Sequence, residues 1–361
     1  DNKMPNERRE TFAQPYRGGQ KLCQKRNPGF DLIRSCAIFC VIGGHFFSIH
    51  TAFRSTVFSG GSMFVQGVFN FFFSMGVPLF ILLTGYLNAT KTVVSKKYYR
   101  GMIRVLVSYL LFSVITIVFR KYYLHTDLSW LQWILKIFDF SAIPYGWYIE
   151  MWIGLFLLTP FLNMLYRAIA TQREKQALLV TLFLLTALPD LLNRYGLHLV
   201  PGFWQQCFPL TYYFAGLYIR EYQPVISWRW GTFLILAICL VNPIFNVLFV
   251  RDHTMIQVSG GCNGVLGMPM AVLFFLMCYR LDIQNKVARW SLMKVSTLSL
   301  DMYLCCFIFD SIYYPWFKER YFVDQSQFGK YFLIIVPMVF VSSLLLAQIK
   351  DSVQNLFKKR I

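Results

Sequence analysis

The first residues to suggest chemistry are Asp31, Arg34 and His45. They lie in segment 30–49, which is apolar and long enough to cross a bilayer. An ionisable side chain at mid-membrane costs at least about 2.5 kcal/mol, so it usually faces a protein interior or a water-filled cavity. Arg34 and His45 are three helical turns apart, so they share a helix face and His45 lies roughly 16 Å deeper. Asp31 precedes Arg34 by three residues, a spacing at which the two can pair.

The imidazole of His45 has two interpretations. An imidazole titrates near neutrality and can take a proton from a hydroxyl, so a histidine in a water-accessible intramembrane pocket can act as a general base. A histidine that only hydrogen-bonds to a neighbouring span would have the same place in the sequence. The spacing alone supports both interpretations equally.

Segment 71–87 contains Gly76 and Pro78, which predict a break within one helix. Backbone groups freed by such a break must be satisfied by neighbours or water, so a break can mark a cavity. A simple kink explains the same residues without any cavity. Tyr86 lies at the end of this segment.

A group of cations follows directly and is expected at the inner membrane face: Lys96, Lys97, Arg100 and Arg104. These side chains can bind the phosphates of a nucleotide-like donor by charge-assisted hydrogen bonds. In isolation, an anchor that contacts lipid phosphates explains them better.

Segment 147–165 begins with Trp147 and Tyr148, which are typical of an aromatic belt at the outer surface. Glu150 lies about one turn further in, so its carboxylate is expected to face an outer cavity. There it can bind sugar hydroxyls or pair with a buried cation. Three further membrane-level carboxylates have a spacing that does not distinguish a site from a scaffold: Asp190, Asp301 and Asp310.

Composition restricts the class of protein. The chain has 361 residues, of which 56% are hydrophobic and 14% charged, and its mean hydropathy is +0.47. These values predict a polytopic membrane protein. The net charge of +18 comes from basic residues that lie between apolar segments. This placement is the one that sets membrane topology, and it argues against nucleic-acid binding. The nine cysteines show no metal-ligand spacing, so neither a metal site nor a disulfide framework is expected.

The hydropathy pattern predicts an all-α fold of about ten transmembrane helices with both termini in the cytoplasm, because most Lys and Arg residues fall in the segments placed inside. The predicted spans are 30–49, 64–87, 102–119, 147–165, 177–192, 207–219, 231–250, 262–279, 295–314 and 331–349. The expected organisation is a disordered basic arm (1–29), a transmembrane domain (30–349) and a basic tail (350–361). The arm has no apolar region typical of a signal peptide. Segment 120–146 is expected outside, with Trp130 and Trp133 on one face of an interfacial helix.

Taken in order, these segments resemble the acyltransferase-3 family of integral membrane acyltransferases, which modify cell-surface glycans in bacteria. FDLIRSCAIFCVIGGH contains the family's Arg-x10-His as Arg34 and His45. GVPLFILLTGYL is similar to the family's GVxLFFxxSGYL, and the basic cluster follows it. WYIEMWIGLFLLTPFL is similar to WYxxxxIGLYLLxPxL. The ordered matches cover roughly the first 165 residues.

The resemblance implies transfer of an acyl group, most often acetyl, from cytoplasmic acyl-CoA to a hydroxyl of a polysaccharide or its lipid-linked precursor. Carried over, His45 is the catalytic base, Arg34 is its partner, and Asp31 orients Arg34. Lys97, Arg100 and Arg104 would bind the acyl-CoA phosphates. Tyr86, Trp147, Tyr148 and Glu150 are expected on the acceptor side or in the pocket. Acyl-CoA would be a co-substrate, with no bound cofactor.

The chain departs from the family pattern in two places. Its cations are spread as Lys97, Arg100 and Arg104 rather than as a compact Arg-x-x-Arg. Tyr145-Gly146 precedes Trp147 where many members have His-Leu, and Glu150 stands where many have an aromatic residue, which suggests a different acceptor pocket.

The leading hypothesis is a multi-pass O-acyltransferase of the bacterial inner membrane. A transporter or flippase for a lipid-linked glycan is the alternative, because broken helices and intramembrane charges suit it equally. A membrane module that serves a partner enzyme is a third. The acceptor, the acyl group, direct transfer or covalent relay, and the oligomeric state stay open.

Overall fold

The computed structural model describes residues 26–193, 198–249, 256 and 261–358, and these form helices and connections without a strand. The helices are α1 (Pro28–His45), α2 (Gly60–Phe73), α3 (Gly76–Asn88), α4 (Lys96–Tyr122), α5 (Trp130–Phe138), α6 (Trp147–Ala168), α7 (Gln172–Thr186), α8 (Leu188–Leu192), α9 (Phe208–Tyr222), α10 (Trp228–Phe249), α11 (Gly267–Cys278), α12 (Lys286–Tyr321), α13 (Gln325–Phe328) and α14 (Phe332–Lys358). A π-helix, η1 (Phe46–His50), continues α1. The arm at 1–29 lies mostly outside the described residues.

The described residues contain eight helical stretches that are long and apolar enough to cross a membrane. This confirms the all-α, polytopic class. The other two predicted spans coincide with α9 and α11, which have only 15 and 12 residues. A span needs about 20 residues, so neither helix crosses a bilayer alone. The exact number of spans and the cytoplasmic termini remain predictions.

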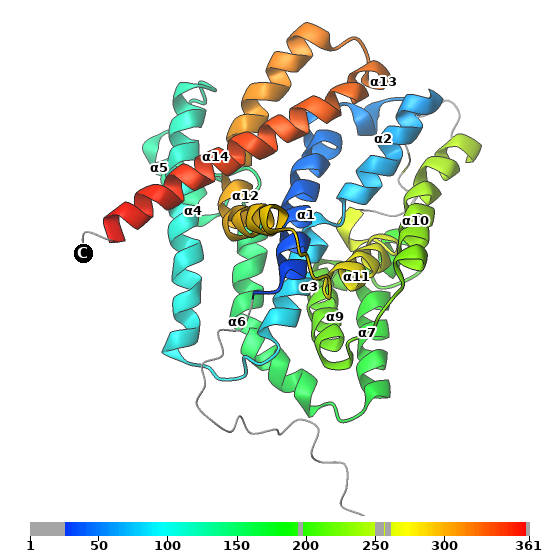
Figure 1. Cartoon of the computed structure of the whole chain (residues 1–361). Coiled ribbons are helices and arrows are strands. Elements are labelled where there is room, and N and C mark those ends of the chain that lie inside the picture. The colour runs from blue at the N-terminus through cyan, green and yellow to red at the C-terminus, as the bar shows by residue number, and fades with distance from the viewer. Residues whose placement is uncertain (1–25, 194–197, 250–255, 257–260, 359–361) are drawn as a thin grey trace, which may run out of the picture.

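The predicted break in segment 71–87 is present. Helix α2 ends at Phe73 and α3 begins at Gly76. A Cβ at Gly76 would lie 2.8 Å from Val41 of α1, so glycine allows the two backbones to approach closely. The break therefore bends the chain against α1, which Figure 1 shows in blue near the centre of the bundle.

The connection from α4 to α6 turns back along α4. The Tyr109 hydroxyl, midway along α4, donates to the Ile137 carbonyl at 2.7 Å, and the Arg120 guanidinium, near the end of α4, lies 5.0 Å from the Trp133 ring. Helix α5 therefore runs antiparallel to the C-terminal half of α4, and α6 begins beside the middle of α4 (Figure 1). The helix predicted around Trp130 and Trp133 exists, but Trp133 is buried and Trp130 is exposed, so the two do not share an outer face.

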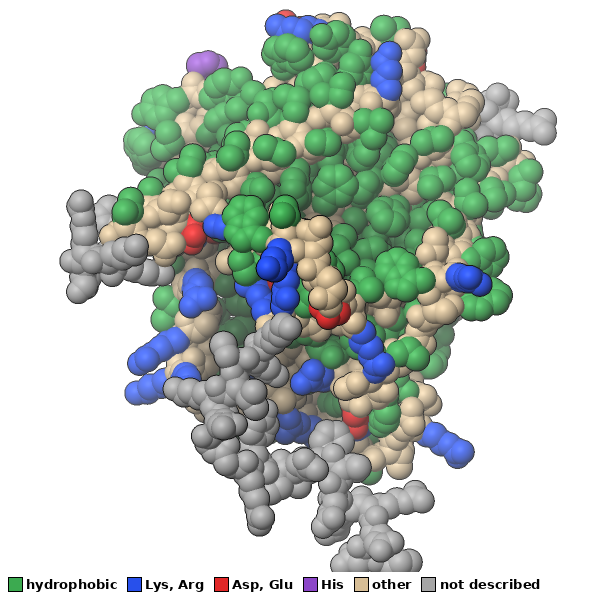
Figure 2. Space-filling model, in the orientation of Figure 1, with side chains coloured by type: hydrophobic (Ala, Val, Ile, Leu, Met, Phe, Trp, Pro, Cys, Tyr) green, Lys and Arg blue, Asp and Glu red, His purple; other side chains and the backbone are tan. Residues whose placement is uncertain are grey.

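Basic side chains are unevenly distributed on the surface. Figure 2 shows Lys and Arg mainly over the lower half of this face, whereas hydrophobic side chains cover most of the upper half. Helix α4 begins with Lys96 and Lys97 at the lower end. This asymmetry is the pattern that the positive-inside rule produces.

Candidate active site

The side chain of His45 is paired with a buried carboxylate from a distant helix. His45 ends α1, and its Nδ1 lies 3.1 Å from Asp310 Oδ2 of α12. Asp310 is fully buried and His45 is 9% exposed. Packing of α1 on α12 brings the two together. A histidine whose Nδ1 faces a carboxylate keeps its other ring nitrogen, Nε2, available as a base.

Two more side chains reach the same carboxylate oxygen. The Tyr145 hydroxyl donates to Asp310 Oδ2 at 2.9 Å, and His50 Nε2 lies 3.5 Å from that oxygen. His50 and Tyr145 are also hydrogen-bonded to each other. The π-helix η1 explains the position of His50, because its wider turn places residues five apart, His45 and His50, toward one side. Tyr314, one turn after Asp310, stacks on His50 with ring centroids 4.5 Å apart.

Tyr145 is held in place by the connection after α5. Arg120 donates to the carbonyls of Ser141 and Ala142 at 3.2 and 3.1 Å. The backbone N–H and hydroxyl of Ser141 both donate to the Asp139 carboxylate, which lowers the pKa of Asp139. The Tyr145 ring packs on the His45 imidazole, with centroids 4.0 Å apart. Because this connection folds back along α4, it places Tyr145 in contact with His45.

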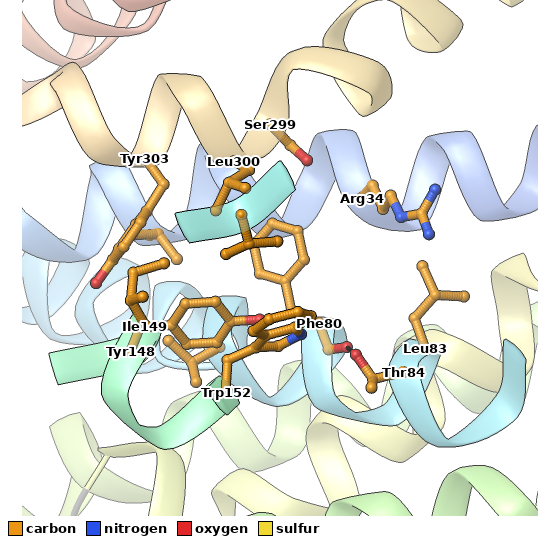
Figure 3. Close-up of a pocket in the computed structure, with 13 residues that line it drawn as sticks. Arg34, Phe80, Leu83, Thr84, Tyr148, Ile149, Trp152, Ser299, Leu300 and Tyr303 are labelled. Atoms are coloured by element: carbon orange, nitrogen blue, oxygen red, sulfur yellow. Dashed lines mark hydrogen bonds between the residues drawn. The ribbon is translucent and has the colours of Figure 1, made fainter. Parts of the chain in front are cut away.

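Figure 3 shows a cavity of about 170 Å³ whose lining does not include His45 or Asp310 but is joined to their cluster through Tyr303. Arg34 stands at one end of it, and Tyr148 and Tyr303 stand toward the other. The Tyr303 hydroxyl donates to the backbone carbonyl of Tyr145, so Tyr303 connects the cavity wall to the His45 cluster. The other walls are mainly apolar and aromatic: Val41, Val77, Phe80, Leu83, Val105, Ile149, Trp152 and Leu300, with Thr84 and Ser299.

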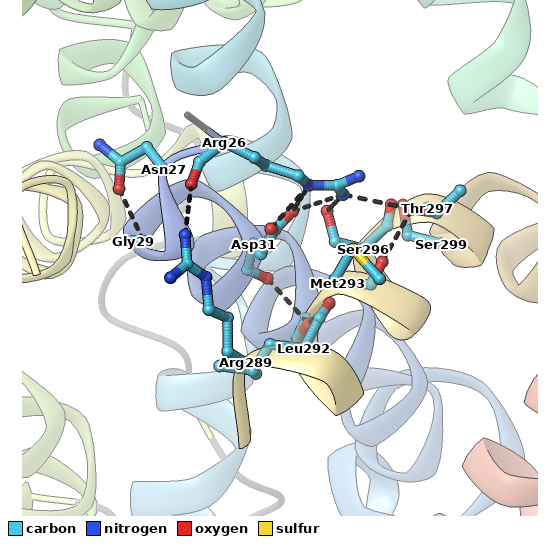
Figure 4. Close-up of polar contacts among 11 residues, drawn as sticks. Arg26, Asn27, Gly29, Asp31, Arg289, Leu292, Met293, Ser296, Thr297 and Ser299 are labelled. Carbon is cyan, nitrogen blue, oxygen red and sulfur yellow. Dashed lines mark hydrogen bonds and ion pairs between the residues drawn. The ribbon is translucent and has the colours of Figure 1, made fainter. Parts of the chain in front are cut away.

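The three residues predicted as catalytic are not brought together. Asp31 does not pair with Arg34, because Arg26 takes its carboxylate, with Nη2 at 2.6 Å from Oδ1 (Figure 4). Arg26 also reaches Ser296 of α12 at 3.3 Å, so Asp31 joins the start of α1 to α12. Arg34 lines the cavity rather than contacting His45, and no carboxylate of the described residues pairs with it.

The predicted donor residues lie at the start of α4. Lys97, Arg100 and Arg104 are exposed, and Val105, next to Arg104, lines the cavity. Their cations are therefore on the helix that forms one cavity wall, near the end of the bundle where Lys and Arg gather. Their contact with phosphates stays a prediction.

The predicted acceptor-side residues separate into different places. Tyr148 lines the cavity, in agreement with its predicted place in the pocket. Trp147 and Glu150 are exposed and do not line this cavity, and their place on the acceptor side stays a prediction. Tyr86 is buried beneath Arg220, whose guanidinium lies 5.1 Å from its ring, and also contacts Phe30 at the start of α1. Tyr86 is thus at the opposite end of α1 from His45.

Sequence reasoning missed the role of three residues that surround His45. In the sequence, Asp310 is recognisable as a membrane-level carboxylate, but its partner is not. Tyr145 stands out there only as a departure from the family pattern. A helical period of 3.6 residues does not predict that His50 lies near His45, because the π-helix changes the direction of the His50 side chain.

A buried histidine–carboxylate pair near a cavity can take up and release a proton. The acyltransferase-3 family model, described as an acyltransferase domain, matches residues 27–347. The chain therefore belongs to the acyltransferase-3 family and is a multi-pass membrane acyltransferase, as the resemblance predicted. No curated protein and no solved structure matches it.

Proposed function

We propose that the protein is an O-acyltransferase of the bacterial inner membrane that moves an acyl group, acetyl in the first instance, from cytoplasmic acyl-CoA to a glycan hydroxyl. The glycan would be a cell-surface polysaccharide or its lipid-linked precursor. The observation that supports this most is the buried pair of His45 and Asp310 beside the cavity that Arg34 and Tyr303 line.

His45 would act as the general base. Asp310 accepts the hydrogen bond from Nδ1–H, so Nε2 is free to take the proton of the attacking hydroxyl. The hydroxyl oxygen bonds to the thioester carbonyl carbon, and the carbon–sulfur bond then breaks. The CoA thiolate takes the proton from Nε2, so the overall transfer neither releases nor consumes a proton. Asp310 favours the imidazolium that forms between these steps.

The donor would enter from the end of the bundle where Lys97, Arg100 and Arg104 lie. A cavity of about 170 Å³ has room for an acyl group and part of the pantetheine arm, but not for the nucleotide. The phosphates would therefore stay outside, where the exposed cations of α4 can bind them. Arg34, which pairs with no carboxylate of the described residues, is available to a donor oxygen in the cavity.

The test is CoA-thiol release from acetyl-CoA by protein purified in nanodiscs, with candidate glycans added. We expect His45→Ala to abolish glycan-dependent release while donor binding persists. His198→Ala is the matched control, because His198 is exposed and lies outside the His45 cluster. Movement of a lipid-linked glycan without thiol release would refute the proposal and support a transporter.

A further inference from the structure

A second set of contacts places a thiol beside the pair of His45 and Asp310. Cys306 Sγ lies 4.0 Å from His45 Nδ1, and one ligand atom each from Cys306, His45 and Asp310 lie within 4.8 Å of one another. All three residues are buried. Cys306 and Asp310 are one turn apart on α12, so they share the face that packs on α1.

The two distances from the His45 nitrogen are close to those around a small divalent cation. In a tetrahedral zinc site with bonds of about 2.0–2.3 Å, neighbouring ligand atoms are about 3.3–3.8 Å apart. The measured 3.1 Å between nitrogen and carboxylate oxygen and 4.0 Å between nitrogen and sulfur lie just on either side of this range. Nitrogen, thiolate and carboxylate together are a ligand set for Zn²⁺ or Co²⁺ rather than for Mg²⁺ or Ca²⁺.

An independent feature also points to a ligand. Among the described residues, His45, Tyr145 and His50 all contact Oδ2 of Asp310, whereas its Oδ1 is buried and has no hydrogen-bond partner there. A buried carboxylate oxygen without a partner is costly. His50 Nε2, at 3.5 Å from Oδ2, is close enough to become a fourth ligand after a small shift.

We propose that Zn²⁺ binds to Cys306, His45 and Asp310 and thereby switches off acyl transfer. Binding at Nδ1 moves the single imidazole proton of His45 from Nδ1 to Nε2, and binding at sulfur releases the thiol proton of Cys306, so one proton leaves. With that proton on Nε2, the metal-bound imidazole can no longer act as a base. The inhibition rests on the proposed role of His45, whereas the binding of metal does not.

Binding is tested with Co²⁺, because a thiolate bound to Co²⁺ gives an intense charge-transfer absorption. The metal-free full chain in nanodiscs is titrated with Co²⁺. We expect the absorption in wild type and its loss in Cys306→Ser, which can keep the hydrogen bond that Cys306 makes to the Tyr303 carbonyl at 3.2 Å. Cys305→Ser is the matched control, since Cys305 is equally buried but faces Ser343 of α14.

Inhibition is then tested with Zn²⁺, and the acylated glycan is measured by mass because Zn²⁺ also binds the free CoA thiol. We expect the inhibitory Zn²⁺ concentration to rise at least about tenfold in Cys306→Ser and to stay unchanged in Cys305→Ser. Cys306→Ala gives a second variant if the serine variant fails to fold. Absence of the Co²⁺ absorption in wild type, or its persistence without Cys306, overturns the site. A Cys306-dependent absorption in a protein without acyl transfer leaves the metal site standing and removes the proposed function.

Discussion

Asp310→Asn tests whether the carboxylate positions His45. The amide has the same shape but no charge, so it removes the charge-assisted hydrogen bond measured at 3.1 Å. Such a bond contributes about 1.5–3 kcal/mol. At about 1.4 kcal/mol for each tenfold change in rate, kcat should fall roughly 10- to 150-fold. The KM for acyl-CoA should change little, because Asp310 does not line the cavity.

The assay is CoA-thiol release with saturating glycan, together with thermal unfolding of each variant. Asp301→Asn is the matched control, because Asp301 is the other carboxylate in the middle of α12 and holds Lys350 at 2.9 Å. Breaking that pair should cost up to roughly 3–5 kcal/mol and lower Tm, while kcat per folded molecule stays normal. Asp310→Asn should instead lower kcat and leave Tm nearly unchanged, because this substitution leaves no buried cation without its partner. A wild-type kcat in folded Asp310→Asn would refute the positioning role.

Three further outcomes are expected. Arg34→Gln should raise the KM for acyl-CoA by about tenfold, because it removes one charged hydrogen bond to the donor. An unchanged KM would show that Arg34 does not bind the donor. Glu150→Gln should leave kcat and KM within about twofold, since Glu150 is exposed and outside the cavity; a larger loss of glycan-dependent turnover would return it to the acceptor site. Gly85→Ala should abolish folded protein, because its Cβ would lie 2.2 Å from the Tyr213 carbonyl oxygen, whereas Gly154→Ala meets nothing within 4 Å and should express normally. Size-exclusion yield in detergent measures both, and equal yields would contradict the packing argument.

Local pattern predicted most of the fold. Every predicted span overlaps a helix of the structure, and the break at Gly76 falls where glycine and proline placed it. The short predicted span 207–219 corresponds to α9, which has only 15 residues. This helix packs closely on α3, because a Cβ at Gly216 would lie 2.3 Å from the Leu82 carbonyl oxygen. Hydropathy reports how apolar a segment is, and it does not distinguish a helix buried by protein from one surrounded by lipid.

The candidate site was only partly predictable, because its partners are far apart in sequence. His45 was singled out by its cost in an apolar segment, but Asp310 is 265 residues away. Nearby spacing also misled: Asp31 and Arg34 have the spacing of a pair, yet Arg26 has folded back onto Asp31 and Ser296. A helix-face argument compares neighbours within one helix only. It cannot include a residue that precedes the helix or one that packs on it.

The surroundings of Asp310 also explain why the site would favour the transition state over the resting state. None of the Lys or Arg residues in the described part of the chain pairs with this buried carboxylate; its contacts are His45, His50 and the Tyr145 hydroxyl. A permanent cation would satisfy Asp310 equally before and during the reaction and so would not accelerate it. In the proposed reaction His45 takes a proton and so supplies the positive charge that Asp310 lacks. The attraction therefore appears only as the proton moves, in a buried environment where it is stronger than in water.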